Sequence, residues 1–559
     1  MRASRREVIT WLLFVALLIA VGYLQTVLYT RNQETAAASS GGIYHEGVID
    51  KIATINPLYI TSEGEQAVSG LVYSGLLRLD ETGSLRPDLA VSYSVSSDGK
   101  TYDIKLRDNV KWSDGKAFSA DDVVFTVNLI KNPVINSTLF GRWKNIDVKK
   151  INNLEVSFTR KDVMTSFPYT LDFGILPAHV LKSVKPSAVK NTFSDNTAAV
   201  VGTGPFVYRS EEILSESQII YRFVANEHYF CGKPRVTAVT IQTYATSEDL
   251  LKGFKTDEIN IAAGLDVTEA AKSLSISSAD LSQIKLGDGV FALFNNSGKI
   301  TGDLAVREAL RLGVDRAAVR EAVIYRSDEK KLKSVWPLET PITPGLVADI
   351  DKLKQPDYNA KAATEKLDAA GWKLNSDGKR MKDGQIMRLS VATVKGKDYE
   401  IAAKKIAEQW RELGIEVELT AVDPSSIQQN YLIPRAYDVL VYQFHLGADP
   451  DISAYWTSSQ ATASGSNFAN YRSKLADLAL NNARTQMDAG KRATNYTYFV
   501  KQYWLPDVPA IALYQPNYYY LAANDVEGLS DRMSLPYESS RFAGIRDFTV
   551  NTDQFRVTP

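Results

Sequence analysis

Short apolar runs separated by turn signals fill the first part of the chain after residue 42. Between residues 43 and 130, turn sequences such as "DETGS" and "SSDGK" punctuate these runs, and "YDIKLRDNVKWSDGK" has the alternation of strands joined by hairpins. "SADDVVFTVNLIKN" predicts a helix, with Ser119 as its N-cap and with Asp121 and Asp122 favourably placed in its first turn. We therefore expect a β-rich region with a few helices here.

Two later regions alternate strands with helices. The predicted elements of the first are a strand at 236–243, a helix at 247–256 and a strand at 258–264; those of the second are strands at 385–394, 415–422 and 437–444, with a helix at 399–413. Such crossovers are typical of parallel sheets, which bind ligands beyond the carboxyl ends of their strands. Two lobes of this kind, joined by a hinge, would form a ligand cleft.

The amino terminus carries a long apolar segment. Residues 8–30 contain no charged side chain, and about 20 apolar residues suffice to cross a bilayer. Arg2, Arg5 and Arg6 precede the segment, so the positive-inside rule places the body outside the cytoplasm. We predict a retained single-pass anchor, followed by a flexible tether to residue 42. A cleaved signal peptide ending near "AAASS" and a twin-arginine signal are the alternatives.

Composition narrows the possible functions. A chain of 559 residues is long enough for several domains, and its net charge of −1 gives no overall field to attract nucleic acid. Cys231 is the only cysteine, so neither an intrachain disulfide nor a thiolate metal site is expected. The four histidines lie far apart, and the common hydrolase and nucleotide-binding motifs are missing. "GTGPF", residues 202–206, is interpreted as a tight turn. We expect no cofactor, no metal and no catalytic residue.

Two carboxylates in an aromatic loop are the main candidates for chemistry. Asp449 and Asp451 follow the strand at 437–444, in "YQFHLGADPDISAYW". They could form a glycosidase-like pair, but only Pro450 separates them, whereas such pairs flank the bond that is cut. They could also simply bond to turn backbone. In the third reading they bind an ammonium group, through charge-assisted hydrogen bonds worth about 1.5–3 kcal/mol and nearby aromatic faces.

Several long segments resemble the family 5 extracellular solute-binding proteins, which include oligopeptide- and dipeptide-binding components of ABC importers. The segments lie at 55–127, 201–208 ("VGTGPFVY"), 294–319, 358–372 and 505–514 ("LPDVPAIALY"). The resemblance implies an α/β, two-lobed clamshell of the periplasmic-binding-protein type. Lobe I would comprise 43–74, 197–293 and 506–559, a β-rich subdomain at 75–196 would be inserted in it, and lobe II would comprise 294–505.

The resemblance also implies ligand contacts and partners. Asp449 is the first choice for the aspartate that meets a peptide amino terminus, and Asp451 is the second. Ser62, Glu63 and Gly64 match a stretch whose backbone pairs with an extended peptide, a contact that is indifferent to side-chain identity.

Among the aromatic residues of the loop, Phe444 at the strand end is favoured over Trp456 as a ligand contact. The expected function is capture of an oligopeptide by a monomeric, non-catalytic receptor that delivers it to an ABC permease. The alternatives are a cell-surface hydrolase for peptides or glycans, a sensory or scaffold protein, and a binding protein for a nickel complex, haem or an oligosaccharide.

Overall fold

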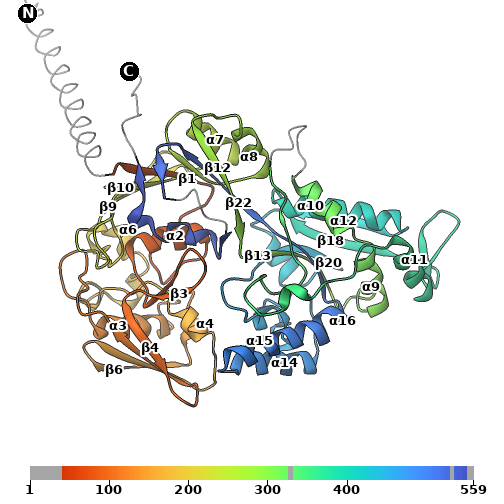
Figure 1. The fold of residues 1–559 in the computed structure, drawn as a ribbon, viewed down its shortest axis with the longest axis horizontal. Helices are drawn as coiled ribbons and strands as arrows, with labels where there is room; N and C mark the ends of the chain where they lie inside the picture. The colour runs from red at the N-terminus through yellow and green to blue at the C-terminus, as the bar shows by residue number, and fades with distance from the viewer. Residues whose placement is uncertain (1–40, 325–331, 529–533, 551–559) are drawn as a thin grey trace, which may run out of the picture.

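The computed structural model of the protein describes residues 41–324, 332–528 and 534–550. The chain forms two lobes that lie side by side (Figure 1). Lobe I is built on an eight-stranded sheet and lobe II on a six-stranded sheet, while a separate four-stranded sheet belongs to the subdomain inserted in lobe I. The predicted two-lobed α/β architecture is therefore confirmed.

The lobe I sheet contains the first predicted strand–helix–strand unit. Its strand order is β24-β12-β22-β11-β1-β10-β9-β8. The strands are β1 (Ile43–Val48), β8 (Phe206–Ile213), β9 (Ile219–Ala225), β10 (Ala238–Thr243), β11 (Ile261–Leu265), β12 (Ala279–Leu286), β22 (Asn517–Ala523) and β24 (Ser534–Leu535). Helix α7 (Ser247–Lys255) connects β10 to β11, and both of these strands run parallel to β1, which lies between them.

The lobe II sheet contains the second unit. Its strand order is β14-β21-β13-β20-β18-β19. The strands are β13 (Asp288–Phe294), β14 (Trp336–Pro337), β18 (Arg388–Val394), β19 (Glu416–Val422), β20 (Val439–His445) and β21 (Ala510–Gln515). Helix α12 (Asp398–Glu412) connects β18 to β19, and β18 runs parallel to both β19 and β20, as the sequence predicts.

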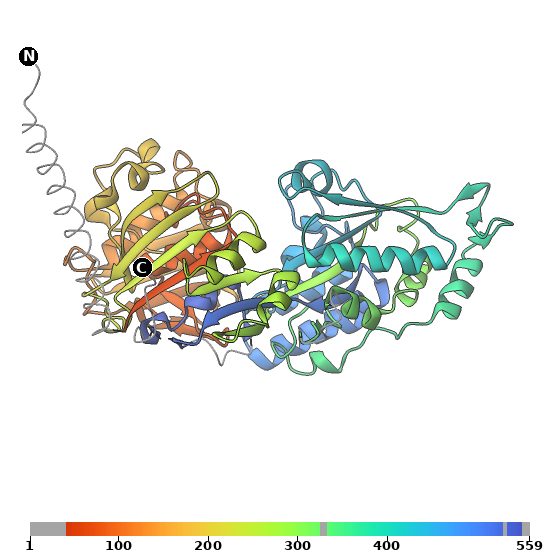
Figure 2. The same cartoon turned by 90° about the horizontal axis from the view of Figure 1, so that it is seen from above.

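Within the described ranges, the chain crosses between the lobes at two points. Gly287 links β12 to β13, and Pro516 links β21 to β22, so each pair of consecutive strands divides between the two sheets. These strands run through the middle of the molecule in Figure 2. The crossings differ from the predicted boundaries at 293/294 and 505/506, because β13 and β21 join lobe II. Apart from Asp288 and Gln515 at their ends, these two strands are continuous buried apolar runs, and such a run does not indicate which of two sheets it will join.

The inserted subdomain shares one apolar core with lobe I, whereas lobe II has a core of its own. The sheet of the inserted subdomain has the strand order β4-β5-β7-β6. The strands are β4 (Ala90–Val95), β5 (Thr101–Leu106), β6 (Ile146–Asn152) and β7 (Glu155–Arg160). Helix α3 (Ala120–Lys131) begins at the predicted N-cap Ser119, whose side chain forms a reciprocal capping box with Asp122. Because of the shared core, the subdomain and lobe I form one body.

The "GTGPF" stretch is a place of close backbone contact. Helix α2 (Glu63–Val72) ends against it, and the N–H of Gly204 donates to the carbonyl of Val72 at 2.8 Å. A Cβ at position 202 would lie 1.9 Å from the same carbonyl oxygen. Glycine is required here because there is no space for a side chain.

The predicted membrane anchor, residues 8–30, lies outside the described ranges. Among the residues that the structure does describe, no helix has the length and apolar character needed to cross a bilayer.

Candidate functional site

A cavity of about 570 Å³ lies between the lobes, where strands of both sheets end. Lobe I contributes residues that follow its parallel strands, including Asp50 after β1 and Gly264 to Asp266 at the end of β11. Lobe II contributes Lys397 after β18 and Gln443 near the end of β20. The carboxyl ends of parallel strands from both lobes therefore face a common space, as expected of a ligand site in sheets of this type.

A second cavity, of about 560 Å³, extends into lobe I and the inserted subdomain. Glu63, Arg142, Asp172 and Tyr537 are among its lining residues. Burial raises the pKa of Asp172 to about 6. In the adjoining interlobe cavity, burial raises the pKa of Glu538 to about 7. Burial therefore shifts the pKa of both Asp172 and Glu538, on the lobe I side of these cavities, toward neutral pH.

Lobe II presents a charged histidine opposite that wall. The Nδ1 atom of His445 lies 3.0 Å from Oδ1 of the buried Asp288, and Gln443 donates to Oδ2 of Asp288 at 2.5 Å. The bond to Asp288 raises the pKa of His445 to about 9, and the carboxylates of Glu63 and Glu538 contribute to that rise. With 55% of its side chain exposed and its pKa raised, His445 carries a positive charge at neutral pH near Glu63 and Glu538.

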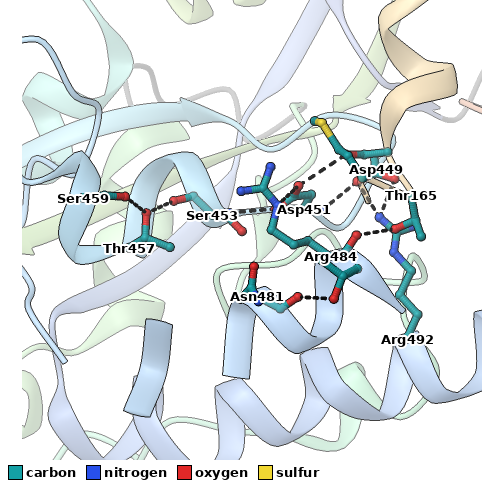
Figure 3. A network of polar contacts seen from close by, with 12 residues as sticks. Thr165, Asp449, Asp451, Ser453, Thr457, Ser459, Asn481, Arg484 and Arg492 are labelled. Atoms are coloured by element: carbon teal, nitrogen blue, oxygen red, sulfur yellow. Dashed lines mark hydrogen bonds and ion pairs between the residues drawn. The ribbon is translucent and has the colours of Figure 1, made fainter. Parts of the chain in front are cut away.

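Asp449 is engaged by an arginine of the same lobe. The Nη2 atom of Arg492, on α15 (Ala489–Phe499), lies 2.9 Å from each carboxylate oxygen of Asp449 (Figure 3). The N–H of Asp451 also donates to Oδ1 of Asp449, at 2.8 Å. Only 12% of the Asp449 side chain is exposed. Burial raises the pKa of its carboxyl group, and the Arg492 guanidinium opposes part of that rise.

Asp451 lies where lobe II meets the inserted subdomain. Its Oδ1 accepts from the N–H of Ser453 at 3.1 Å, which matches the turn-forming alternative considered for this loop. Its Oδ2 accepts from the hydroxyl of Ser166, a residue of the inserted subdomain, at 3.3 Å, and lies 3.5 Å from Nε of Arg484. Neither Asp449 nor Asp451 is among the residues that line the interlobe cavity or the lobe I cavity.

Phe444 and Trp456 are packed inside lobe II. Phe444 is 3% exposed and Trp456 is fully buried. The ring of Tyr455 stacks on Phe444 at a centroid distance of 4.2 Å, and its hydroxyl donates to the carbonyl of His445 at 2.7 Å. Tyr455 therefore covers Phe444, the residue for which the sequence favoured ligand contact. The alternation along β20 places the exposed His445, rather than Phe444, toward the space between the lobes.

The "SEG" segment begins helix α2. Ser62 has the extended backbone of an N-cap, whereas Glu63 and Gly64 are already helical. The N–H of Gly64 and the hydroxyl of Ser62 both donate to Oδ2 of Asp50, at 2.8 and 3.0 Å. Only Ser62 thus has the conformation that pairing with an extended peptide requires. Glu63 lines the lobe I cavity, and Gly64 lines the interlobe cavity.

Several residues of this site were missed from the sequence. His445 is adjacent to the predicted Phe444, and the period of two along a strand was the available signal for its orientation. Asp172, Asp288, Arg492 and Glu538 come from distant parts of the chain, and their sequence surroundings contain no motif. Only the tertiary fold brings Asp172 and Glu538 to the cavities. The same holds for the contacts of Asp288 with His445 and of Arg492 with Asp449.

The geometry is that of a two-lobed binding protein, and comparison with known proteins gives its family. The profile of the bacterial extracellular solute-binding proteins, family 5, matches residues 84–466. The chain belongs to this family.

The chain is similar to the oligopeptide-binding protein AppA of Bacillus subtilis strain 168, with 28% identity over 542 residues, or 94% of this chain and 96% of AppA. The solved structure of B. subtilis AppA in complex with a nonapeptide superposes with a TM-score of 0.74 and 26% identity, covering 91% of this chain and 99% of that one. The structure of NikZ from Campylobacter jejuni in complex with Ni(L-His) gives a TM-score of 0.76 and 27% identity, with the same coverage.

Proposed function

We propose that this protein binds an oligopeptide between its lobes and delivers it to an ABC importer in the membrane. The observation that carries the proposal is the cavity of about 570 Å³ to which both lobes contribute strand-end residues. Its size is within the roughly 300–1,000 Å³ that is usual for ligand sites. Similarity to AppA over nearly the whole length of both chains favours a peptide as the ligand.

The charges of the cleft suit a ligand that carries both signs, as a peptide does. Glu63, Asp172 and Glu538 provide carboxyl groups on the lobe I side, and Lys397 provides a cation on the lobe II side. The half-exposed His445 adds a positive charge near Glu63 and Glu538. A ligand that touches both walls binds the closed form better than the open form. It therefore shifts the equilibrium toward closure.

We also propose that Asp449 binds the ammonium group of the peptide, which requires a change in its contact with Arg492. Arg492 already contacts both carboxylate oxygens, so a ligand ammonium group must displace the guanidinium or share the carboxylate with it. Asp451 would support this loop through its contacts with Ser453 and Asp449. Phe444 and Trp456 would contribute indirectly, as the buried ring cluster beneath the loop.

A titration calorimetry screen of residues 41–559 tests the proposal. We expect oligopeptides to bind with 1:1 stoichiometry and nickel–histidine complexes not to bind. Replacing Lys397 by Met should weaken peptide binding, whereas replacing the exposed Lys361 of lobe II should not. Binding of nickel–histidine with no response to any peptide would reject the peptide assignment in favour of the alternative raised by the similarity to NikZ.

Peptides with a blocked amino terminus isolate the role of Asp449. If the ammonium group displaces Arg492, blocking should weaken binding to the wild type and have much less effect on Asp449→Asn. Equal affinities of free and blocked peptides for the wild type would remove the ammonium assignment and leave peptide binding as such intact.

We also propose that residues 8–30 anchor the receptor beside its permease. The support is the uncharged apolar sequence and the arginines that precede it. Tethering would raise the effective concentration of the receptor at the permease. Cell fractionation should find the full chain in the membrane, and a variant in which a cleavable secretory signal peptide replaces residues 1–40 in the soluble extracytoplasmic fraction. A full chain released without detergent would contradict the anchor.

A further inference from the structure

The lobes also touch at a site separate from the two crossing points at Gly287 and Pro516. Thr165, in the inserted subdomain, donates to the carbonyl oxygen of Arg484 in lobe II, both from its backbone N–H at 3.1 Å and from its hydroxyl at 2.8 Å. The neighbouring Ser166 donates its hydroxyl to Oδ2 of Asp451 at 3.3 Å. Figure 3 shows Thr165 beside the polar groups of lobe II.

The acceptor in lobe II is available because it lies at the end of a helix. Arg484 is in the last turn of α14 (Lys474–Thr485), where backbone carbonyls have no partner within the helix. The N–H of Gln486 bonds to the carbonyl of Ala483, and the adjacent carbonyl of Arg484 receives both bonds from Thr165. The inserted subdomain thus caps a helix of the opposite lobe.

Two turns of the inserted subdomain approach lobe II beside these hydrogen bonds. A Cβ at Gly99 would lie 3.0 Å from the sulfur of Met487, and a Cβ at Gly83 would lie 3.5 Å from the Cβ of Ala448. Because the subdomain shares its core with lobe I, hinge opening would have to separate these contacts as a group. Once separated, each polar group could bond to water instead, so the net stabilisation is modest and opening remains reversible.

We propose that Thr165 and Ser166, with Arg484 and Asp451, form an interlobe latch that stabilises the closed conformation even before a ligand enters. Asp451 also belongs to the loop that carries Asp449, since its N–H bonds to that carboxylate. A displacement of Asp449 would therefore be transmitted directly to the latch. The proposal concerns closure of the lobes and holds for any ligand.

Distance measurements on ligand-free protein test the latch. Spin labels on the exposed Lys149 of β6 and Lys491 of α15 would report lobe separation by pulsed electron resonance, with Cys231 replaced by Ser to prevent extra labelling. The double variant Thr165→Val/Ser166→Ala should lower the ratio of closed to open molecules about tenfold, which corresponds to about 1.4 kcal/mol. The matched control is Thr159→Val, at an exposed position on β7 of the same subdomain, and should leave the ratio unchanged.

A second variant keeps the test decisive if the double variant folds poorly. Ser166→Asp places a carboxylate against Asp451, so repulsion should open the lobes further than loss of the hydroxyl alone. Identical distance distributions in the wild type, the double variant and Ser166→Asp would overturn the latch, whether all three are open or all three are closed. The latch would also be overturned if the control Thr159→Val shifted the distance distribution as much as the double variant does.

Discussion

Replacing Arg541 by Met should remove the ion pair that holds the C-terminal segment on the lobe I sheet. Arg541 belongs to the short helix η8 (Glu538–Phe542), and its Nε donates to Oε1 of Glu46 on β1 at 2.8 Å. The Arg541 side chain is 3% exposed and that of Glu46 is fully buried. Tyr44 donates to the other oxygen of Glu46 at 2.7 Å.

The expected cost follows from leaving a carboxylate buried without its cation. Removing one partner of a buried ion pair typically costs about 3–5 kcal/mol, whereas replacing both partners by apolar residues is often close to neutral. The double variant Glu46→Leu/Arg541→Met should therefore recover most of the stability lost in the single variant. Tyr44 would keep a partner in the double variant, since its hydroxyl also lies 2.6 Å from that of Tyr520.

Urea denaturation followed by circular dichroism measures these free energies of unfolding. The midpoint should fall in Arg541→Met with little change in the slope, and most of the fall should be reversed in the double variant. Arg388→Met is the control, because it breaks a pair with Glu416 in which the arginine side chain is 65% exposed, and should cost less than about 1 kcal/mol. The reasoning is refuted if the double variant is as unstable as the single one, or if Arg541→Met behaves like the control.

Three further outcomes are expected. Gly202→Ala should lower the free energy of unfolding by about 1–3 kcal/mol through overpacking. Gly70 is on an exposed face of α2 with nothing near its Cβ position, so Gly70→Ala should raise it by about 0.5–1 kcal/mol. Equal denaturation midpoints for the two variants would contradict this. Trp456 is fully buried, so Trp456→Ala should lower the free energy of unfolding by about 3–5 kcal/mol in urea denaturation. Trp336 is 40% exposed, so Trp336→Ala should lower it much less. The pKa of His445 is raised in the folded protein to about 9, so its stabilising contribution is complete below about pH 6.5 and is lost as the pH rises through 9. Because the side chain is half exposed, the free energy of unfolding of the wild type should fall by only about 1 kcal/mol more than that of His445→Gln between pH 6 and pH 10. Parallel curves of unfolding free energy against pH for the two proteins would refute the assignment.

Local patterns in the sequence were sufficient for the strand–helix–strand units and for the cap of α3. The strands at 236–243 and 385–394, and the helix at 399–413, were predicted close to their observed bounds, because apolar periodicity and capping residues act over a few neighbouring positions. The assignment of β13 and β21 to lobe II could not be made this way. Each strand pairs with partners far along the chain, and its own residues would suit either sheet.

The candidate site shows the same division. The sequence by itself determined that Asp449 and Asp451 follow the carboxyl end of a strand, which runs parallel to β18. Only the tertiary structure decided that Arg492 engages Asp449 and that Ser166 of the inserted subdomain reaches Asp451. Strand ends follow from periodicity, which is a local property. The partner of a buried charge depends on which distant residues the packing of lobes and helices brings within a few ångströms.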